Sequence, residues 1–363
     1  MHLLVDISAH GLGHLAQTAP VLNALRPLLP GLRLSLRSAL PLARLRARVE
    51  GEFEHIAAAS DFGFVMHNAV DIDRVGSAQK YREFHADWAQ RVAVGADELR
   101  RRQVDAVLSN AAYLPLAAAA EAGIPAVGMS SLNWADMFAH YFGREAWAAP
   151  IHAQILDAYN TAAAFLCFTP GLPMRDFRRR IVLGPVAGIG RRDRGYFSHL
   201  LGLEESRRWL LVAMGGMDFP LATERLPSRP DVCWLLPGSP EGFARGDLRG
   251  VYLDDSRFAD LLASVDAVIT KPGYGTFVEA ACAGTPIVYL ERDDWPETPH
   301  FAAWLAQHSR AAAIGREALL AGSFMPVLEA LWRQPAPIQP DPTGGAEAAR
   351  ELAKLFARAA GSV

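Results

Sequence analysis

Residues 265–290 read VDAVITKPGYGTFVEAACAGTPIVYL, and this stretch decides the fold. The apolar run Val265–Thr270 predicts a buried strand, and the glycine-rich segment Lys271–Thr276 predicts a loop. The pattern then predicts a short helix over Phe277–Ala283, ended by glycine and proline, and a second strand over Ile287–Leu290. A strand, a loop, a helix and a further strand in this order are typical of a parallel α/β sheet.

The same stretch also predicts half of a nucleotide site. Free backbone N–H groups and the helix dipole both favour an anion where a glycine loop opens a helix. Gly273 and Gly275 remove steric bulk there, and Thr276 can donate its hydroxyl to a phosphate. Glu279, which the pattern places in the first helical turn, suits ribose hydroxyls, as acidic residues do in other nucleotide-binding α/β folds. No G-K-[ST] follows, so the loop is not a P-loop.

Composition bounds the class of protein. The 363 residues are 51% hydrophobic and 21% charged, which indicates a globular protein with a large core and a length suited to two domains. A net charge of −3 implies no general affinity for nucleic acid. Cys167, Cys233 and Cys282 lie far apart in apolar contexts without metal spacing, which favours buried thiols in a reducing compartment.

Localisation is predicted from the absence of targeting signals. The chain enters a strand at once, without a signal-peptide pattern, and no apolar stretch reaches the roughly 18–20 residues of a membrane span. We therefore expect a cytoplasmic protein. The arginines between Arg26 and Arg48 leave contact with a membrane surface open, although solvated faces usually explain such runs.

The chain reads as two similar doubly wound domains. Each half starts with a strand and a glycine loop, AHGLGH at 9–14 and AMGGMD at 213–218. We predict one Rossmann-like domain over 1–188 and a second, nucleotide-binding Rossmann-like domain over 189–345. The final helix, 346–363, is expected to pack back on the first domain. Two such domains facing each other would bring both glycine loops to one cleft.

One long segment of the first half is predicted to be mostly helical. It runs over Ser77–Arg102, with a break expected near Gly95, because glycine is unfavourable inside a helix.

The first glycine loop, Gly11-Leu12-Gly13-His14, follows a strand and opens a helix. It is not a full dinucleotide fingerprint, since Ala16 stands at the third glycine and no acidic residue follows the second strand, which disfavours a dehydrogenase. Gly11 and Gly13 can let the backbone approach a ligand closely, and His14 can exchange a proton near neutral pH. A tight turn with a surface histidine is the alternative.

Two further loops of the second half are candidates for contacts with the nucleotide. Gly215 and Gly216 follow a strand and can let backbone N–H groups reach a phosphate. The backbone at Leu253 can read a base edge, although its two following acids can equally cap a helix.

The loop after Leu290 is stiff and polar, and it follows the carboxyl end of a strand. Glu297 and His300 in this loop are candidates for contacts with sugar hydroxyls. Asp293 and Asp294 are discounted as a metal site, because adjacent side chains point to opposite sides of an extended chain.

Polar residues that follow the strands of the first half are predicted to line the acceptor side, with a loop or cap role as the alternative for each. They are Asp61, His67, Asn110, Ser130 and Asn133. Asp136 is a second candidate, beside His14, for the catalytic base.

These features together resemble a GT-B glycosyltransferase. The half that begins near Trp209 resembles the MurG-like transferases that use UDP-sugars. The chain is also similar to the glycosyltransferase-like N-terminal region of plant L-arabinokinases and to stand-alone bacterial relatives of that region. The segments that carry this likeness are HGLGH (10–14), DFGFV to QKY (61–81), AGIPAVGMSSLNW (122–134) and KPGYGTFVEA (271–280).

The resemblance implies a role for each matching residue. Gly215, Gly216, Gly275 and Thr276 would hold the diphosphate, Glu279 the ribose, and the backbone near Leu253 the uracil. His14 would stand where the MurG-like loop has its histidine. The relatives usually carry aspartate where Ser109-Asn110 stands here, so a histidine–aspartate relay through this position is in doubt.

The expected function is metal-independent, inverting transfer of a sugar from a nucleotide-sugar, UDP-linked by resemblance, to an unidentified acceptor. No cofactor is expected beyond the nucleotide-sugar as co-substrate. Lys271 would help to bind the donor if its side chain turns inward. A non-hydrolysing UDP-sugar epimerase and a catalytically inactive sugar-nucleotide-binding protein are the alternatives.

Overall fold

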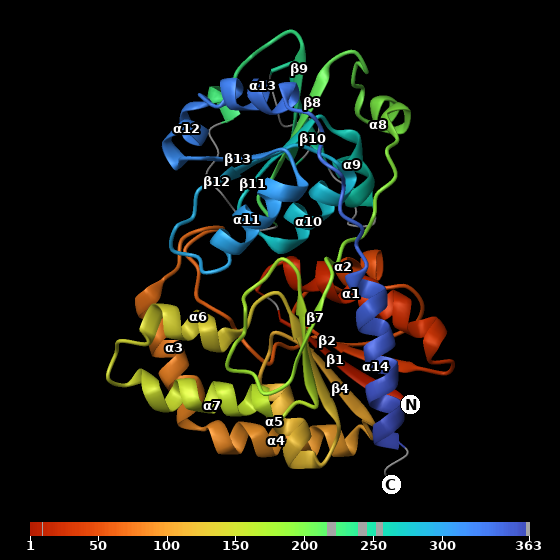
Figure 1. Ribbon diagram of the computed structural model, residues 1–363, viewed down its shortest axis with the longest axis vertical. Coiled ribbons are helices and arrows are strands. Elements are labelled where there is room, and N and C mark those ends of the chain that lie inside the picture. Colours follow the sequence, from red (N-terminus) through yellow and green to blue (C-terminus); the bar gives the residue numbers. More distant parts are fainter. Residues whose placement is uncertain (9, 216–222, 239–244, 252–256, 361–363) are drawn as a thin grey trace. The chain divides into compact units, whose positions relative to one another are not determined.

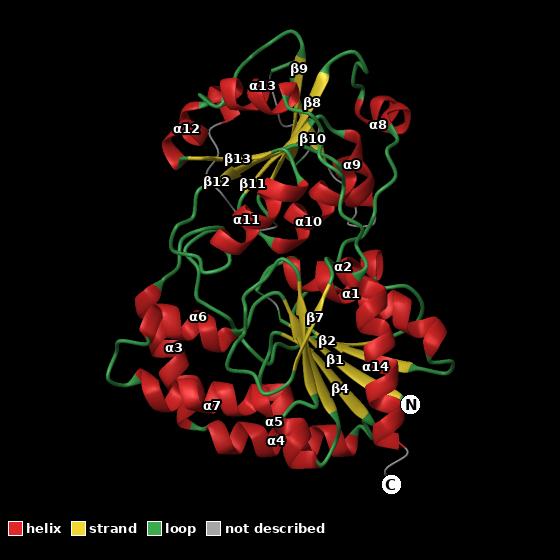
Figure 2. Cartoon of the chain, viewed as in Figure 1, coloured by secondary structure: helices red, strands yellow, loops and turns green. Residues whose placement is uncertain are grey.

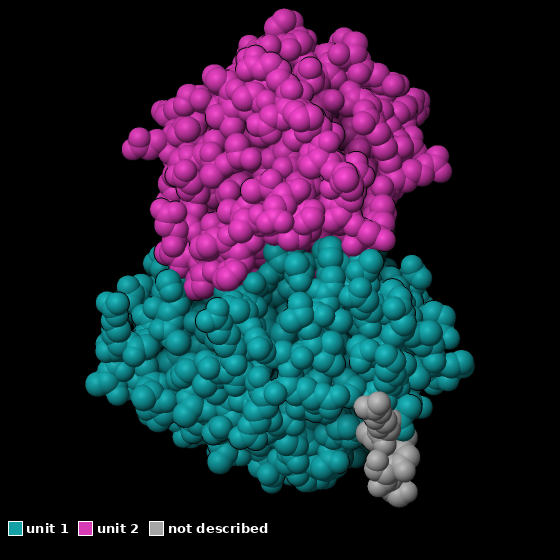
Figure 3. All heavy atoms as spheres, viewed as in Figure 1, with its two compact units in different colours: residues 1–67, 71–186, 343–363 teal, residues 68–70, 187–342 magenta. Residues whose placement is uncertain are grey.

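The computed structural model describes every residue of the chain except 9, 216–222, 239–244, 252–256 and 361–363. The chain divides into two compact units, which Figure 3 shows in different colours. Unit 1 comprises Met1–His67, Asp71–Val186 and Thr343–Val363, and unit 2 comprises Asn68–Val70 and Ala187–Pro342.

Unit 1 is built on a seven-stranded, wholly parallel sheet with the order β3-β2-β1-β4-β5-β6-β7 (Figure 1). Its strands are β1 His2–Ile7, β2 Arg33–Arg37, β3 Glu54–Ile56, β4 Ala106–Asn110, β5 Ala126–Ser130, β6 Ala164–Phe168 and β7 Arg180–Leu183. Every residue of β1, β4, β5 and β6 is buried. Strands covered on both faces need mainly apolar side chains, which explains why most residues of these four strands are apolar.

The helices of unit 1 cover both faces of this sheet (Figure 2). They are α1 Gly13–Leu25, η1 Arg26–Leu28, α2 Leu42–Arg48, α3 Arg74–Ala86, α4 Trp88–Arg101, α5 Leu114–Ala122, α6 Trp134–Phe142, α7 Ala148–Asn160 and α14 Gly344–Ala360. The C-terminal helix α14 packs against α1. Glu347 in its first turn accepts a hydrogen bond from the Gly184 backbone N–H at 2.8 Å, which ties the end of the chain to the end of β7.

The helix break expected near Gly95 is wrong. The segment divides at Asp87, between α3 and α4, and Gly95 lies inside α4. A Cβ on Gly95 would lie 2.9 Å from the Cβ of Ala118 on α5. The glycine is therefore explained by the close packing of α4 on α5, which offsets its unfavourable helix propensity.

Unit 2 holds a second parallel sheet, with six strands in the order β10-β9-β8-β11-β12-β13. The strands are β8 Arg208–Ala213, β9 Val232–Pro237, β10 Leu248–Val251, β11 Ala267–Thr270, β12 Ile287–Leu290 and β13 Ala311–Ile314. The helices are α8 Arg194–Leu201, η2 Thr223–Arg225, α9 Phe258–Ser264, α10 Tyr274–Ala283, α11 Thr298–His308, α12 Arg316–Ala321 and α13 Met325–Arg333. Large apolar side chains such as Trp234, Phe324 and Leu328 fill its core together with Val70.

The prediction of two parallel, doubly wound α/β sheets is confirmed. In each sheet the strand order reverses at one point, between β1 and β4 in unit 1 and between β8 and β11 in unit 2. Ligands of open α/β sheets bind outside the carboxyl ends of the strands at such a switch point. Among the described residues, no helix is both long and apolar enough to cross a membrane.

Helix α10 starts earlier than the sequence predicts. Gly273, with an extended backbone, is its N-cap, and Tyr274 is its first residue. Gly275 and Thr276 therefore lie in the first helical turn, and Glu279 lies in the second turn. The N–H groups of a first turn have no acceptor within the helix, so they point out of its N-terminus.

Candidate functional site

His14 lies at the switch point of unit 1, in the first turn of α1, which follows β1. Its Nδ1 is 2.7 Å from Oδ1 of Asn110, the last residue of β4, so one hydrogen bond joins the helix that follows β1 to the end of the neighbouring strand β4. Gly11 has a φ of 91°, a left-handed conformation that a residue with a Cβ rarely adopts. The glycine thus lets the chain turn from β1 into the helix that carries His14.

The surroundings of Asn110 determine which nitrogen of His14 carries the proton. The Thr18 hydroxyl donates to the His14 carbonyl at 2.8 Å and accepts from Asn110 Nδ2 at 3.0 Å. Nδ2 also faces the Gln17 Oε1 atom at 3.3 Å. The amide oxygen must then face His14, whose Nδ1 carries the hydrogen and donates it. Nε2 therefore holds the lone pair of the ring.

Burial sets the charge of His14. The side chain is 5% exposed, and this burial lowers its pKa to about 4, although the hydrogen bond with Asn110 opposes the shift. His14 is therefore neutral near pH 7 and holds a lone pair that can accept a proton. The prediction of a surface histidine, which was the alternative at this position, is wrong.

A buried carboxyl group lies near the same edge of the sheet. Asp61 accepts a hydrogen bond from the Trp134 indole N–H at 2.7 Å, and the Trp134 ring lies 5.9 Å from the His14 ring. Burial, with a smaller contribution from the charge of Asp6, raises the pKa of Asp61 to about 7. Trp134 thus joins Asp61 and His14 in one buried cluster.

The other predicted residues of unit 1 differ in their surroundings. Ser130 donates to Gln17 at 3.3 Å, which places it in the network around Asn110. Asn133 caps helix α6 by accepting from the Asp136 N–H, and its amide donates to the Asp136 carboxylate at 2.9 Å. Burial raises the pKa of Asp136, while Asp176 and His152 act on it through their charges. No hydrogen bond or ion pair joins Asp136 to His14 in the described part of unit 1, and His67 is exposed.

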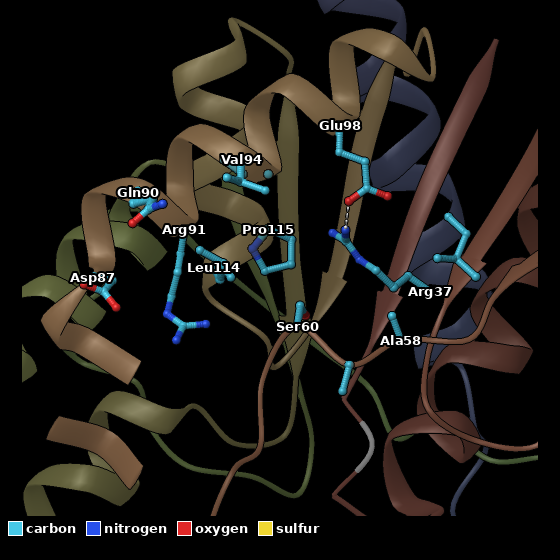
Figure 4. A pocket seen from close by; sticks show the side chains of 14 residues that line it. Arg37, Ala58, Ser60, Asp87, Gln90, Arg91, Val94, Glu98, Leu114 and Pro115 are labelled. Atoms are coloured by element: carbon cyan, nitrogen blue, oxygen red, sulfur yellow. Dashed lines mark hydrogen bonds and ion pairs between the residues drawn. The ribbon is translucent and has the colours of Figure 1, made fainter. Parts of the chain in front are cut away.

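Unit 1 also contains a cavity of about 470 Å³ at the carboxyl edge of its sheet (Figure 4). Arg37, at the end of β2, donates to Asp6 and Glu98 there. Along α4 the cavity is lined by Arg91 and Val94, among others. The five residues predicted for the acceptor side are not among those that line it.

In unit 2, the side chain of Lys271 lies at the switch point, where the strand order reverses between β8 and β11. A Cβ on Gly215, which follows β8, would lie 3.1 Å from Cε and 3.5 Å from Nζ of Lys271. The corresponding distance to Nζ from a Cβ on Gly273, the N-cap of α10, would be 3.8 Å. The ammonium group therefore lies between the loop after β8 and the start of α10, and the expectation that this side chain could turn inward agrees with its position.

The two predicted sugar-contacting residues of unit 2 follow β12, Glu297 at the end of the loop and His300 at the start of α11. Glu297 is buried and accepts a hydrogen bond from the Trp295 indole at 3.0 Å. The guanidinium of Arg292 lies 4.0 Å from the centre of the Trp295 ring. His300 is exposed in the first turn of α11, and Glu279 is buried within α10. Gly216 and Leu253 lie outside the described residues.

Sequence reasoning missed two members of the network at His14. Gln17 and Thr18 are both buried and both contact Asn110. They follow His14 at spacings of three and four, which places all three on one face of a helix. Polar residues at this spacing on an otherwise apolar helix were the available signal.

Known proteins resemble this chain in sequence and in fold. No protein-family model matches the chain. The chain is similar to an L-arabinokinase of Arabidopsis thaliana, with 28% identity over 280 residues, which cover 74% of this chain and 26% of the arabinokinase. The chain thus corresponds to only about a quarter of that protein's length.

Solved glycosyltransferases share the fold along the whole chain. The kitacinnamycin glycosyltransferase has a TM-score of 0.61 and 15% identity, covering 99% of this chain and 95% of its own. A UDP-glucosyltransferase from Polygonum tinctorium that glucosylates indoxyl has a TM-score of 0.61 and 14% identity, covering 98% of both chains. The expected resemblance to GT-B glycosyltransferases is confirmed, and the chain has the GT-B fold of these proteins.

Proposed function

We propose that the protein is an inverting, metal-independent glycosyltransferase that uses a nucleotide-sugar, with UDP as its nucleotide. In the reaction, an acceptor oxygen forms a bond to the anomeric carbon while the bond from that carbon to the diphosphate breaks. The acceptor proton passes to His14, and the nucleoside diphosphate leaves. A single displacement of this kind inverts the anomeric configuration.

The observation that carries this proposal is the state of His14 at the switch point of unit 1. Its Nδ1–H is engaged by Asn110, so Nε2 presents a lone pair. A general base needs this lone pair before it can take a proton from a hydroxyl. The amide oxygen of Asn110 then stabilises the ring as positive charge develops on it, although less strongly than a carboxylate would.

The donor is proposed to bind at the switch point of unit 2. The N–H groups of the first turn of α10 and the hydroxyl of Thr276 are suited to the diphosphate, and Gly215 leaves room for it. Glu279 is proposed to hold the ribose. Backbone dipoles and side-chain cations would stabilise the leaving diphosphate in place of a metal ion. The fold shared with the UDP-glucosyltransferase from Polygonum tinctorium supports the choice of UDP.

The acceptor hydroxyl is proposed to lie within hydrogen-bond reach of Nε2 of His14, because a general base must contact the proton that it takes. The cavity beside α4 is not lined by His14, so it is not assigned to the acceptor.

A second candidate function is a nucleotide-sugar-binding protein without turnover. Asn110 favours it, because a neutral amide gives the His14 imidazolium no compensating charge, and the pKa of His14 is already lowered to about 4. In that case His14→Ala would change no property except ligand affinity.

A nucleotide panel tests both candidates. We expect UDP or dTDP, but not NAD, to raise the melting temperature, since a ligand that binds only the folded state stabilises it. UDP release from UDP-sugars is then measured with pooled hydroxyl acceptors in the wild type and in His14→Ala. Release that depends on His14 supports transfer, binding without release supports the second candidate, and stabilisation by NAD alone overturns both.

A further inference from the structure

The cavity of about 470 Å³ in unit 1 lies outside the two proposed sites, because neither His14 nor any residue of unit 2 lines it. Its lining comes from the ends of β2 and β3, the loop after β3, α4 and the start of α5 (Figure 4). Several lining residues are small, which keeps the space open: Ala58, Ala59, Ser60, Gly95 and Ala118. A space of this volume is suited to a small organic molecule.

Arg91 brings a positive charge without an acidic partner to this cavity. Its guanidinium lies 4.7 Å from the centre of the Phe84 ring, which holds it in place on α4. Its side chain makes no ion pair or hydrogen bond with any residue that the structure describes, although Asp87 also lines the cavity. A guanidinium in this state is suited to a carboxylate, which its fork of donors can bind through two parallel hydrogen bonds.

Arg37 supplies a second donor to the cavity from the end of β2. Its side chain is only 10% exposed, and its Nε and Nη1 donate to Asp6 and Glu98. The remaining nitrogen, Nη2, makes no hydrogen bond with a described residue and stays accessible. Because polar groups in buried surroundings are normally paired, Nη2 is suited to donate to an oxygen of a ligand.

The acidic groups around the two arginines limit the charge of the ligand. Asp87 and Glu98 line the cavity, and Asp6 pairs with Arg37 from β1. These carboxylates balance the guanidinium groups, so the cavity carries no excess of positive charge. A ligand with several negative charges would be repelled there, whereas a single carboxylate beside Arg91 would not.

The cavity also offers an apolar surface. Val94 on α4 is 58% exposed, although its side chain is apolar. Leu114 and Pro115, at the start of α5, line the same cavity (Figure 4). A ligand that covered these three side chains would remove apolar area from water, which favours binding. The ligand should therefore have an apolar body besides its carboxylate.

We propose that this cavity is a second ligand site, which takes a small organic acid with one carboxylate and an apolar body. The carboxylate pairs with Arg91, and the apolar body packs on Val94, Leu114 and Pro115. Nη2 of Arg37 donates to a second oxygen of the ligand where it has one. The site does not depend on the proposed glycosyl transfer, since it shares no residue with the donor site or with the His14 network.

An NMR titration with 4-phenylbutyrate tests the site, with the neutral 4-phenylbutyramide and the doubly charged 4-phenylbutylphosphonate as matched probes. We expect the carboxylate to bind with a Kd of about 1 mM or lower, and the other two probes to bind at least about tenfold more weakly. The methyl resonances of Val94 should shift, and those of Val75, exposed on α3, should not. No binding of the carboxylate at about 10 mM, or equal binding of the amide, would overturn the proposal.

Two substitutions, each with a matched control, are followed at the ligand signals in the same titration. Arg91→Met should weaken binding of 4-phenylbutyrate by about tenfold or more, because a charge-assisted hydrogen bond is lost, whereas Arg101→Met removes an exposed arginine of the same helix outside the cavity and should have no effect. Val94→Trp fills the cavity and should abolish binding, whereas Val75→Trp should not. Wild-type affinity in Arg91→Met or in Val94→Trp would overturn the site. No readout uses a nucleotide, so failure of the proposed function would leave these results unaffected.

Discussion

At the switch point of unit 1, His14 lies in a neutral hydrogen-bonded network, whereas at the switch point of unit 2 Lys271 is a cation with no hydrogen bond or ion pair to a described residue. Both sites use the same topology, with a reversal of strand order and a glycine beside the ligand-facing edge. The topology therefore fixes where each site lies, and the side chains fix its chemistry. The first site is suited to moving a proton and the second to holding an anion.

The largest difference between the two sites should be seen in turnover. His14→Ala removes the proposed base, so we expect the rate of UDP release with acceptor to fall by about 10²- to 10⁴-fold. The rate is measured at saturating UDP-sugar, with His199→Ala as a control, since that histidine is exposed on α8 and belongs to no predicted site. A rate within about twofold of the wild type would remove His14 from the chemistry.

The neutral state of His14 should also be visible in folding stability. Its pKa in the folded protein, about 4, lies below the ordinary histidine value of 6.5, so the unfolded chain binds a proton more readily as the pH falls. The contribution of His14 is thus present above pH 6.5 and is lost toward pH 4. Between about pH 7 and pH 4.5, the titration of His14 should lower the free energy of unfolding by about 2 kcal/mol.

Chemical denaturation of the wild type and His14→Gln at both pH values measures this contribution. Glutamine does not titrate, so the variant should lose about 2 kcal/mol less than the wild type over that range. Equal losses would mean that burial does not keep His14 neutral in the folded protein.

The proposed contact between Glu279 and the ribose should be measurable in the affinity of unit 2 for UDP. If Glu279 holds the ribose hydroxyls, Glu279→Ala should weaken UDP binding by about 10- to 100-fold, which corresponds to the loss of a charged hydrogen bond. Binding of pyrophosphate, which has no ribose, should change little. Affinity for UDP within about twofold of the wild type would contradict this role.

Local elements of the fold could be predicted from the sequence better than contacts between distant residues. The strand at 267–270 and the helix that follows it were predictable, because an apolar run and its glycines report local geometry. The exact start of α10 was not, since Tyr274 to Thr276 satisfy a loop pattern equally well. The short strand β3 was missed because its residues are only partly buried and carry no apolar alternation.

Contacts between distant residues were beyond the sequence pattern. His14 and Asn110 are 96 positions apart, and only the order of the strands brings them together. The sequence indicated both residues, yet it predicted no bond between them. Likewise, nothing local to Lys271 shows that Gly215 lies beside it or that Arg292 lowers its pKa.

The most direct test of the division between the two sites is the affinity for UDP, measured by calorimetry in two variants side by side. Gly215→Ala adds a Cβ at a φ of 76° and within 3.1 Å of Lys271, so it should weaken UDP binding by about tenfold. His14→Ala should bind UDP as tightly as the wild type. Wild-type affinity in Gly215→Ala together with weakened binding in His14→Ala would contradict the account.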